Sequence, residues 1–147
     1  MLWPRLAAVM LGVFAGLSLT TFYYARGTSY LRDDPVVCKN CHIMREHFDA
    51  WNRSSHARSA SCNDCHTTHD PLGKYAVKAL NGWNHGAAFT TGGFHEPIMI
   101  RPFNREIVIA NCVRCHVDLA GRMTAFSGTD RIDCIRCHRA AGHGPRG

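Results

Sequence analysis

The N-terminal part of the chain is an uninterrupted apolar segment. Residues 6–24 contain no charged side chain, and Arg5 and Arg26 lie on either side of them. A helix of this length spans roughly 30 Å, the thickness of the hydrocarbon layer of a membrane. The segment is longer than the apolar region of a cleaved signal peptide, and Tyr23 stands where a cleavage site would need a small residue. The pattern therefore predicts an uncleaved, single-pass transmembrane signal anchor over residues 1–27.

The clearest helix outside the anchor is predicted from Asp70 to about Gly86. Asp70 can cap its N-terminus, Pro71 suits its first position, and Gly86 lies near the expected end. Apolar residues recur along one face at steps of three and four: Leu72, Tyr75, Ala76, Ala79, Leu80 and Trp83. A polar stripe follows the same helix at similar steps: Lys74, Lys78, Asn81 and His85. A stripe of this kind is usually a solvated face.

The remaining patterns predict short elements. Helices are expected over about 43–51 and about 104–111, whereas 90–93 and the proline-containing region 97–102 have the composition of loops. The C-terminal residues 142–147 combine glycines with a proline and predict no regular structure. The fold class that follows is mostly α with much irregular structure.

One motif recurs four times in this irregular part. The pattern Cys-x-x-Cys-His occupies 38–42, 62–66, 112–116 and 134–138. These motifs use all eight cysteines: Cys38, Cys41, Cys62, Cys65, Cys112, Cys115, Cys134 and Cys137. The two thiols of such a motif add to the vinyl groups of a haem, and the histidine supplies an axial iron ligand. The sequence therefore predicts four covalently bound haems c.

Two other uses of eight cysteines explain less of the pattern. Paired Cys-x-x-Cys units could form two Cys₄ zinc sites, but zinc has no need of a histidine fixed at the next position in every motif. A disulfide framework is possible in an exported chain, yet it explains those histidines no better.

Composition indicates that the haems replace a conventional core. After Arg26 the apolar residues are scattered among glycines, histidines and charges, in a chain of 147 residues. We therefore expect residues 28–147 to form a small periplasmic domain packed around its haems, which should not fold without them. The net charge of +6 suits anionic lipid head groups or an acidic partner. There is no nucleic-acid-binding motif.

The anchor contains a small-residue spacing of its own. Gly12 and Gly16, extended backward by Ala8, could form a face for close packing against a second helix. Because glycine is common in membrane helices, self-association and an unpaired helix are equally compatible with this spacing.

Axial ligands cannot be assigned from spacing alone. Four six-coordinate haems need eight, the motifs supply four histidines, and six further histidines with Met44 and Met99 exceed the remaining demand. The first motif continues as His42-Ile-Met44, and side chains two residues apart point about 200° apart on a helix. His42 and Met44 therefore cannot both reach the same face of one haem.

The anchor, the four haem motifs and Cys-x-x-Cys-His-x-Met at the first of them resemble the NapC/NirT family of membrane-anchored tetrahaem quinol dehydrogenases. The short length and Met44 are similar to its NrfH branch, the small subunit of cytochrome c nitrite reductase. The resemblance covers essentially the whole chain. Its most specific stretches are Cys38 to Met44, Ser55-His56-Ala57, Cys62 to His66, Lys78 to His85, and His138 followed by His143.

For the two terminal haems the resemblance implies incomplete ligand sets. Met44, and not His42, would ligate haem 1 and leave the other face open toward the quinol. Methionine ligation generally raises a haem potential relative to histidine. His138 would ligate haem 4, whose second ligand can come from a lysine of the partner in this family.

For the two middle haems the resemblance implies histidine pairs. His66 would pair with the downstream His143 on haem 2, and His116 with the upstream His56 on haem 3. Three histidines are left as surface residues or haem-propionate neighbours: His47, His69 and His95.

The resemblance also implies a direction of electron flow. Menaquinol would be oxidised at haem 1, with Lys78, His85 and Lys74 of the polar stripe nearby, and electrons would leave from haem 4 to a periplasmic multihaem reductase, a pentahaem nitrite reductase. His85 stands where some relatives have an acidic residue. It could accept a quinol proton as a neutral imidazole or ligate haem 1. The chain lacks the Cys-x-x-Cys-Lys motif expected of the nitrite-reducing subunit.

Two other functions fit the same motifs. The chain could be a tethered electron carrier in the cytoplasmic membrane without a quinol site, or an anchor subunit whose main role is to hold a different periplasmic reductase. The Lys78 and His85 stripe together with Met44 favours the quinol dehydrogenase.

Overall fold

The computed structural model describes residues 2–128 and 132–144, and within them the regular structure is entirely helical. The elements in chain order are α1 (Leu2–Tyr24), η1 (Gly27–Leu31), η2 (Pro35–Asn40), η3 (His42–Met44), α2 (Arg45–Asn52), η4 (Ser55–Arg58), α3 (Cys62–His66), α4 (Pro71–Thr91), α5 (Pro102–Cys115), α6 (Val117–Ser127) and α7 (Cys134–Cys137). The expected fold class, mostly α with much irregular structure, is confirmed.

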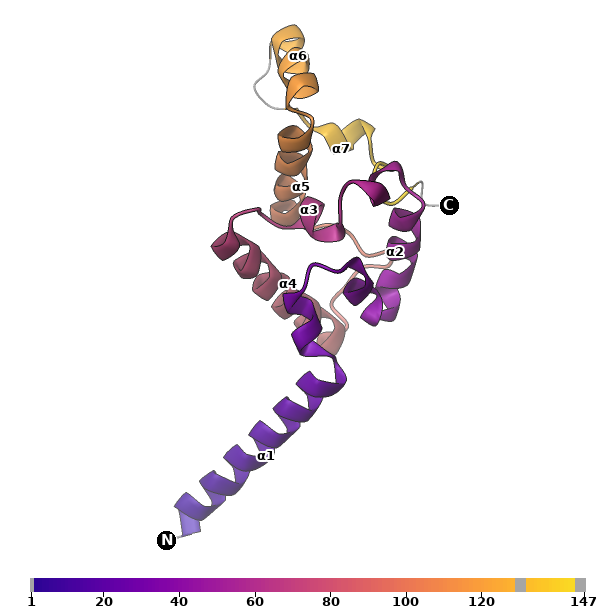
Figure 1. Cartoon of the computed structure of the whole chain (residues 1–147). Coiled ribbons are helices and arrows are strands. Elements are labelled where there is room, and N and C mark those ends of the chain that lie inside the picture. Colours follow the sequence, from indigo (N-terminus) through magenta and orange to yellow (C-terminus); the bar gives the residue numbers. More distant parts are fainter. Residues whose placement is uncertain (1, 129–131, 145–147) are drawn as a thin grey trace.

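Helix α1 projects from the rest of the molecule as a single rod (Figure 1). None of its residues is buried, and it is the one helix of the described part that is long and apolar enough to cross a membrane. It ends at Tyr24, close to the expected boundary of the anchor at residue 27, which stays a prediction. A side chain added at Gly12 or Gly16 would meet nothing within 4 Å, so self-association through this face also stays a prediction.

Helix α4 begins as expected and ends later than expected. The Asp70 side chain accepts a hydrogen bond from the Gly73 amide at 2.5 Å, and Pro71 occupies the first turn. The expected end at Gly86 and the loop at 90–91 are wrong, because the helix continues to Thr91. The stop is Gly92, whose φ of 72° is the left-handed conformation that ends a helix, whereas Gly86 is helical and only lacks a side chain.

The other helices are displaced or longer than the sequence predicted. Helix α2 is preceded by a 3₁₀ turn, η3, so the α-helical geometry expected around His42 begins only at Arg45. Helix α5 starts at Pro102, which suits a first helical position, and runs through both cysteines of the third motif. Helix α6 was not predicted. The C-terminal residues described, 142–144, lie in a turn and irregular chain, and the rest of that stretch is outside the described residues.

The protein has almost no apolar core of its own. Among the described residues the only buried hydrophobic side chains are Val77, 4% exposed, and Ala120, 8% exposed. A chain of this size normally relies on burial of many apolar side chains for its stability. Their scarcity agrees with a domain whose interior is provided by bound groups.

Polar contacts hold helix α5 against the second and fourth motifs. The buried Asn111 side chain donates to the carbonyls of Cys65 and Thr67, both at 2.9 Å. Near the start of the same helix, Arg105 pairs with Asp133 at 2.5 Å, just before the fourth motif. Helix α5 therefore connects three of the four motifs.

The motifs are ordered along the molecule. Figure 1 shows α1 leaving at one end, with η2 and η3 of the first motif in the part of the domain nearest to it, and α6 and α7 at the opposite end. Helices α3 and α5, which carry the second and third motifs, lie between these ends.

Candidate haem and quinol sites

The second motif has a histidine partner from the C-terminus of the described chain. The rings of His66 and His143 have centroids 5.9 Å apart, with planes inclined by 37°. Two imidazoles on opposite sides of one iron have ring centres about 6 Å apart, given metal–nitrogen bonds of about 2 Å and about 1 Å from each nitrogen to its ring centre. The observed separation fits one iron between these rings.

The third motif has an equivalent pair. The rings of His56 and His116 have centroids 6.2 Å apart and are nearly perpendicular, at 80°. His56 lies in η4, 60 residues before His116, so this pair could not follow from local spacing. Both pairs are those that the family resemblance implied for the middle haems.

The two recruited histidines are oriented by backbone carbonyls. Nδ1 of His143 lies 3.1 Å from the His47 carbonyl, and Nδ1 of His56 lies 3.0 Å from the Ala141 carbonyl. A ring that donates its Nδ1–H in this way presents Nε2 to a metal. Burial, followed by the positive charges of His143 and His47 when protonated, lowers the pKa of His66 to about 4, so its ring is neutral at physiological pH, as a ligand must be.

The cysteines fit covalent haem attachment better than either alternative. All eight are free in the structure, so no disulfide framework is formed. Within residues 2–128 and 132–144, no three His, Cys, Asp or Glu side chains converge on a point that could hold a bare metal ion. The four Cys-x-x-Cys-His motifs are the residues that would hold haem c.

The first motif differs from the middle two. Met44 is half-buried and His42 is exposed, at the two ends of the 3₁₀ turn η3. At about 120° per residue such a turn still points side chains two apart in different directions. Tyr30, in the segment after the anchor, places its hydroxyl 3.7 Å from the Cys41 sulfur, and burial together with Cys41 raises the pKa of Tyr30 to about 12. The assignment of Met44 as ligand stays a prediction.

A charged cluster lies beside the first motif. Lys78 Nζ is 3.1 Å from the Asp33 carboxylate and donates to the Arg32 carbonyl at 2.9 Å. Lys74 forms an ion pair with the same carboxylate, and Asn63 of the second motif donates to it at 2.8 Å. The hydrogen bonds from Lys74 and Lys78 lower the pKa of Asp33 to about 2. We call Asp33, Lys74 and Lys78 the juxtamembrane cluster.

The cluster corrects the interpretation of the polar stripe as a solvated face. The Lys78 side chain is only 15% exposed, and both lysines point toward the segment that leaves the anchor. Asp33 was missed by the sequence analysis. The available signal was the Asp33-Asp34 pair, two adjacent acids directly before the first haem motif in an otherwise basic flank.

The polar stripe is divided along α4. Asn81, one turn after Lys78, accepts a hydrogen bond from the Asn104 side chain of α5 at 2.9 Å. His85 lies at the surface with one part of its ring covered, and within the described chain no hydrogen bond joins it to the juxtamembrane cluster. Partial burial, and then the positive charge of Arg101, lowers the pKa of His85. The stripe therefore provides two lysines, Lys74 and Lys78, that bind the same carboxylate. Two turns beyond Lys78 it provides a neutral imidazole, His85.

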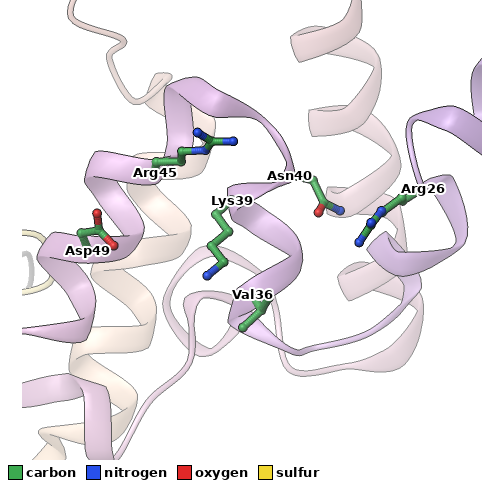
Figure 2. A pocket seen from close by; sticks show the side chains of 6 residues that line it. All are labelled: Arg26, Val36, Lys39, Asn40, Arg45 and Asp49. Carbon is green, nitrogen blue, oxygen red and sulfur yellow. The ribbon is translucent and has the colours of Figure 1, made fainter.

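An open cleft of about 610 Å³ lies beside the first motif, and no residue of the juxtamembrane cluster lines it (Figure 2). Its lining consists of Arg26, Val36, Lys39, Asn40, Arg45 and Asp49. Three cationic side chains against one carboxylate suit an anionic group, such as the propionates of a haem attached at Cys38 and Cys41.

The fourth motif also opens onto a cleft, of about 590 Å³. Its lining consists of Ala50, Arg53, Ser54, Ser55, Cys137, His138, Ala140, Ala141, His143 and Gly144. His138 is exposed, and although His143 lines the same cleft, its ring packs against those of His66 and His47. Within the described part of the chain, no second histidine therefore pairs with His138 as His143 pairs with His66 and His56 pairs with His116.

The three unassigned histidines have separate surroundings. His47 lies against His143, with ring centroids 5.3 Å apart. His69 places Nε2 3.2 Å from the Asp64 carbonyl. His95 is exposed.

The chain is similar to known multihaem cytochromes over almost its whole length. Residues 3–100 match the N-terminal region of the NapC/NirT cytochrome c family. The chain is 35% identical to the cytochrome c-type protein NrfH of Wolinella succinogenes, an alignment that covers 92% of this chain and 83% of that protein. It is 32% identical to the cytochrome c nitrite reductase subunit NrfH of Nitratidesulfovibrio vulgaris, over 95% of this chain and 84% of that protein.

A solved structure has a similar fold. The cytochrome c nitrite reductase NrfHA complex bound to the HQNO inhibitor contains a chain that matches 95% of this one, with a TM-score of 0.65 and 31% sequence identity. That match covers 89% of the other chain. The similarity therefore extends across the anchor and the haem-motif domain together.

Proposed function

Because this chain belongs to the NapC/NirT cytochrome c family, we propose that it is a membrane-anchored tetrahaem menaquinol dehydrogenase. Haem c, attached through the eight motif cysteines, supplies one-electron carriers when bound. The partner that receives the electrons is a periplasmic multihaem reductase, a pentahaem nitrite reductase that forms ammonia. The names of the relatives, which are nitrite reductase subunits, support this choice of partner.

The observation that carries the proposal is the order of the motifs in space. The first motif and the juxtamembrane cluster lie where α1 enters the domain, and the fourth motif lies at the far end (Figure 1). A lipid-soluble quinol can reach only the first of these places, whereas a periplasmic protein can reach the second. The anchor over residues 1–27 and the periplasmic domain over 28–147 belong to the same proposal.

The protons released by the quinol have to be accepted by side chains of this protein. Quinol oxidation releases two electrons and two protons, so a proton acceptor must lie within hydrogen-bond reach of the quinol hydroxyls. Asp33 is held ionised by Lys74 and Lys78 and is therefore a poor base, but it fixes the position of Lys78, which can donate a hydrogen bond to a quinol oxygen. His85, held neutral by partial burial and Arg101, is the proton acceptor.

Oxidation of a menaquinol analogue by the purified holoprotein tests the proposal. We expect Lys78→Ala to lower the rate by roughly a hundredfold, the lower end of the usual effect of a general acid or base, with unchanged haem content. Arg122→Ala is the control, because Arg122 is an exposed cationic side chain of α6, outside the first motif, the cleft beside it and the juxtamembrane cluster.

Two results would contradict the proposal. If the parent protein does not oxidise the quinol analogue, although chemical reductants reduce its haems, the chain is a tethered electron carrier. If deletion of this chain releases the reductase from the membrane while electron transfer to the reductase persists, the main role of the chain is to anchor its partner.

A further inference from the structure

Helix α4 has an outward face that is apolar along its whole length. Leu72 is 88% exposed and Trp83 is 76% exposed, and Tyr75 and Leu80 are also exposed. The small residues of the same face are exposed as well: Ala76, Ala79, Gly86 and Ala87. The face contains no charged side chain. An apolar strip of this length on a protein surface is normally covered by something.

The opposite face of α4 is the polar one, and it packs against the rest of the domain. Val77 is buried, Lys78 binds the Arg32 carbonyl and Asp33, and Asn81 binds Asn104 of α5. A helix at the surface of a water-soluble domain has the reverse arrangement, with its apolar stripe inside. The orientation is fixed by these polar contacts, so the apolar face cannot turn inward.

The position of α4 relative to α1 indicates what covers this face. Arg32 and Asp33, the residues bound by Lys78 and Lys74, follow the end of α1 at Tyr24 by only eight and nine residues. Figure 1 shows α4 on the side of the domain from which α1 projects, running across the direction of α1, with the other helices on its far side. If α1 crosses the bilayer, α4 lies along the membrane surface.

The composition of the face suits lipid. Helices that lie in the interface bury an apolar face at the boundary between head groups and acyl chains. Trp and Tyr are enriched at that depth because one part of each ring is apolar and one is polar. Trp83 and Tyr75 provide such side chains, and Leu72 and Leu80 provide the apolar contact.

We propose that α4 is an interfacial helix whose outward face, Leu72, Tyr75, Leu80 and Trp83, rests on the outer leaflet of the membrane. The domain then has two membrane contacts, α1 through the bilayer and α4 on it. The second contact fixes the rotation of the domain about α1 and holds the juxtamembrane cluster at lipid level. This contact does not depend on which electron donor is used.

Photolabelling of the holoprotein in lipid nanodiscs tests the contact. The bilayer contains a phosphatidylcholine with a diazirine near the carbonyl end of one acyl chain, and adducts are mapped by peptide mass spectrometry. We expect adducts on α1, as positive control, and on the outward residues of α4. Helix α6 is the matched negative control, because Val117, Leu119, Met123 and Phe126 are equally exposed but lie at the opposite end of the domain.

A double variant gives the size of the effect. In Leu80→Gln with Trp83→Gln, we expect α4 labelling to fall about tenfold, which corresponds to about 1.4 kcal/mol of lost apolar burial. Labelling of α1 and haem absorbance should not change, which shows that the variant is folded and inserted. The matched variant Phe126→Gln should leave α4 labelling as it is.

Three outcomes would overturn the proposal. One is labelling of α1 without α4, and another is equal labelling of α4 and α6. The third is protein–protein cross-links from α4 to a second copy or to a co-purified subunit in place of lipid adducts.

Discussion

The two middle haem motifs and the two terminal ones are completed in different ways. In the middle, His66 and His116 each face a second histidine of the same chain at about the separation that one iron requires. At the ends, the first motif is followed by Met44 beside a charged cluster, and His138 of the fourth opens onto a cleft. A haem with one internal ligand leaves its other face open to a substrate or a partner. We therefore expect electrons to enter and leave at the two terminal motifs.

The largest effect is expected from breaking a middle pair. In His143→Ala the second motif keeps only His66, so one low-spin haem should become high-spin. Quinol-driven electron delivery should fall by more than about a hundredfold, since loss of a ligand exceeds the roughly 10–100-fold effect of losing an outer-shell partner. Electron paramagnetic resonance and steady-state rates measure both. His95→Ala, at an exposed histidine, is the control; an unchanged spectrum in His143→Ala would refute the pairing.

Substitution of His85 tests whether its imidazole accepts the protons that the quinol releases. His85→Asn should lower quinol oxidation by about tenfold at neutral pH, less than the full general-base effect because Lys78 can still donate to the quinol oxygen. The pKa of His85 lies below its usual 6.5, so the parent rate should fall only as the pH drops below that value and His85 becomes protonated. The variant should lose this dependence, as pH–rate profiles will show.

The His85 experiment has a control and a clear contrary result. Arg101→Gln removes the charge that contributes to the lowered pKa, so the acid limb should move to higher pH. A new high-spin haem in His85→Asn would mean that His85 is a haem ligand and not a proton acceptor.

An intermediate effect is expected where the middle motifs are joined. Asn111→Ala leaves the carbonyls of Cys65 and Thr67 without their donor inside the protein, which should cost about 1–3 kcal/mol of the free energy of unfolding. Denaturant titration of the holoprotein followed by haem absorbance measures it. The exposed Asn52, at the end of α2, is the control, and Asn52→Ala should change stability by less than about 0.5 kcal/mol. Equal effects of the two would show that Asn111 does not join the motifs.

The smallest effect is expected at the membrane end. The pKa of Asp33 is lowered from 3.8 to about 2, so its ion pairs contribute stability above pH 3.8 that is lost as the pH falls toward 2. Because Asp33 is half exposed, solvent screening keeps the contribution below about 1 kcal/mol. Asp33→Asn should flatten the pH dependence of the denaturation midpoint over that range. A midpoint that falls as steeply in the variant would show that other carboxylates are responsible.

The sequence was sufficient where the signal was local or where the chemistry admits one answer. The uncharged run predicted α1, Asp70 and Pro71 predicted the start of α4, and the repeated motif predicted haem. It was insufficient for the end of α4, because Gly86 and Gly92 differ only in backbone conformation. Helix α6 has no capping side chain at its start, so the sequence contains no signal for the N-terminus of this helix.

The orientation of α4 could not be predicted for a further reason. In an ordinary domain, burial of the apolar stripe decides which face of a helix points inward. Here the domain has almost no apolar interior among its described residues, and Asp33 binds Lys74 and Lys78 from 41 and 45 residues away in the sequence. The polar face is therefore inside, an arrangement that hydrophobic periodicity alone would reverse.

The most direct test of the difference between middle and terminal motifs is the set of haem ligands in the purified, fully loaded chain without its partner. Electron paramagnetic resonance combined with near-infrared magnetic circular dichroism distinguishes bis-histidine haems from methionine-ligated and high-spin ones. The account predicts two bis-histidine haems, from His66 with His143 and His56 with His116, and two haems of other ligation. Four bis-histidine haems would contradict it.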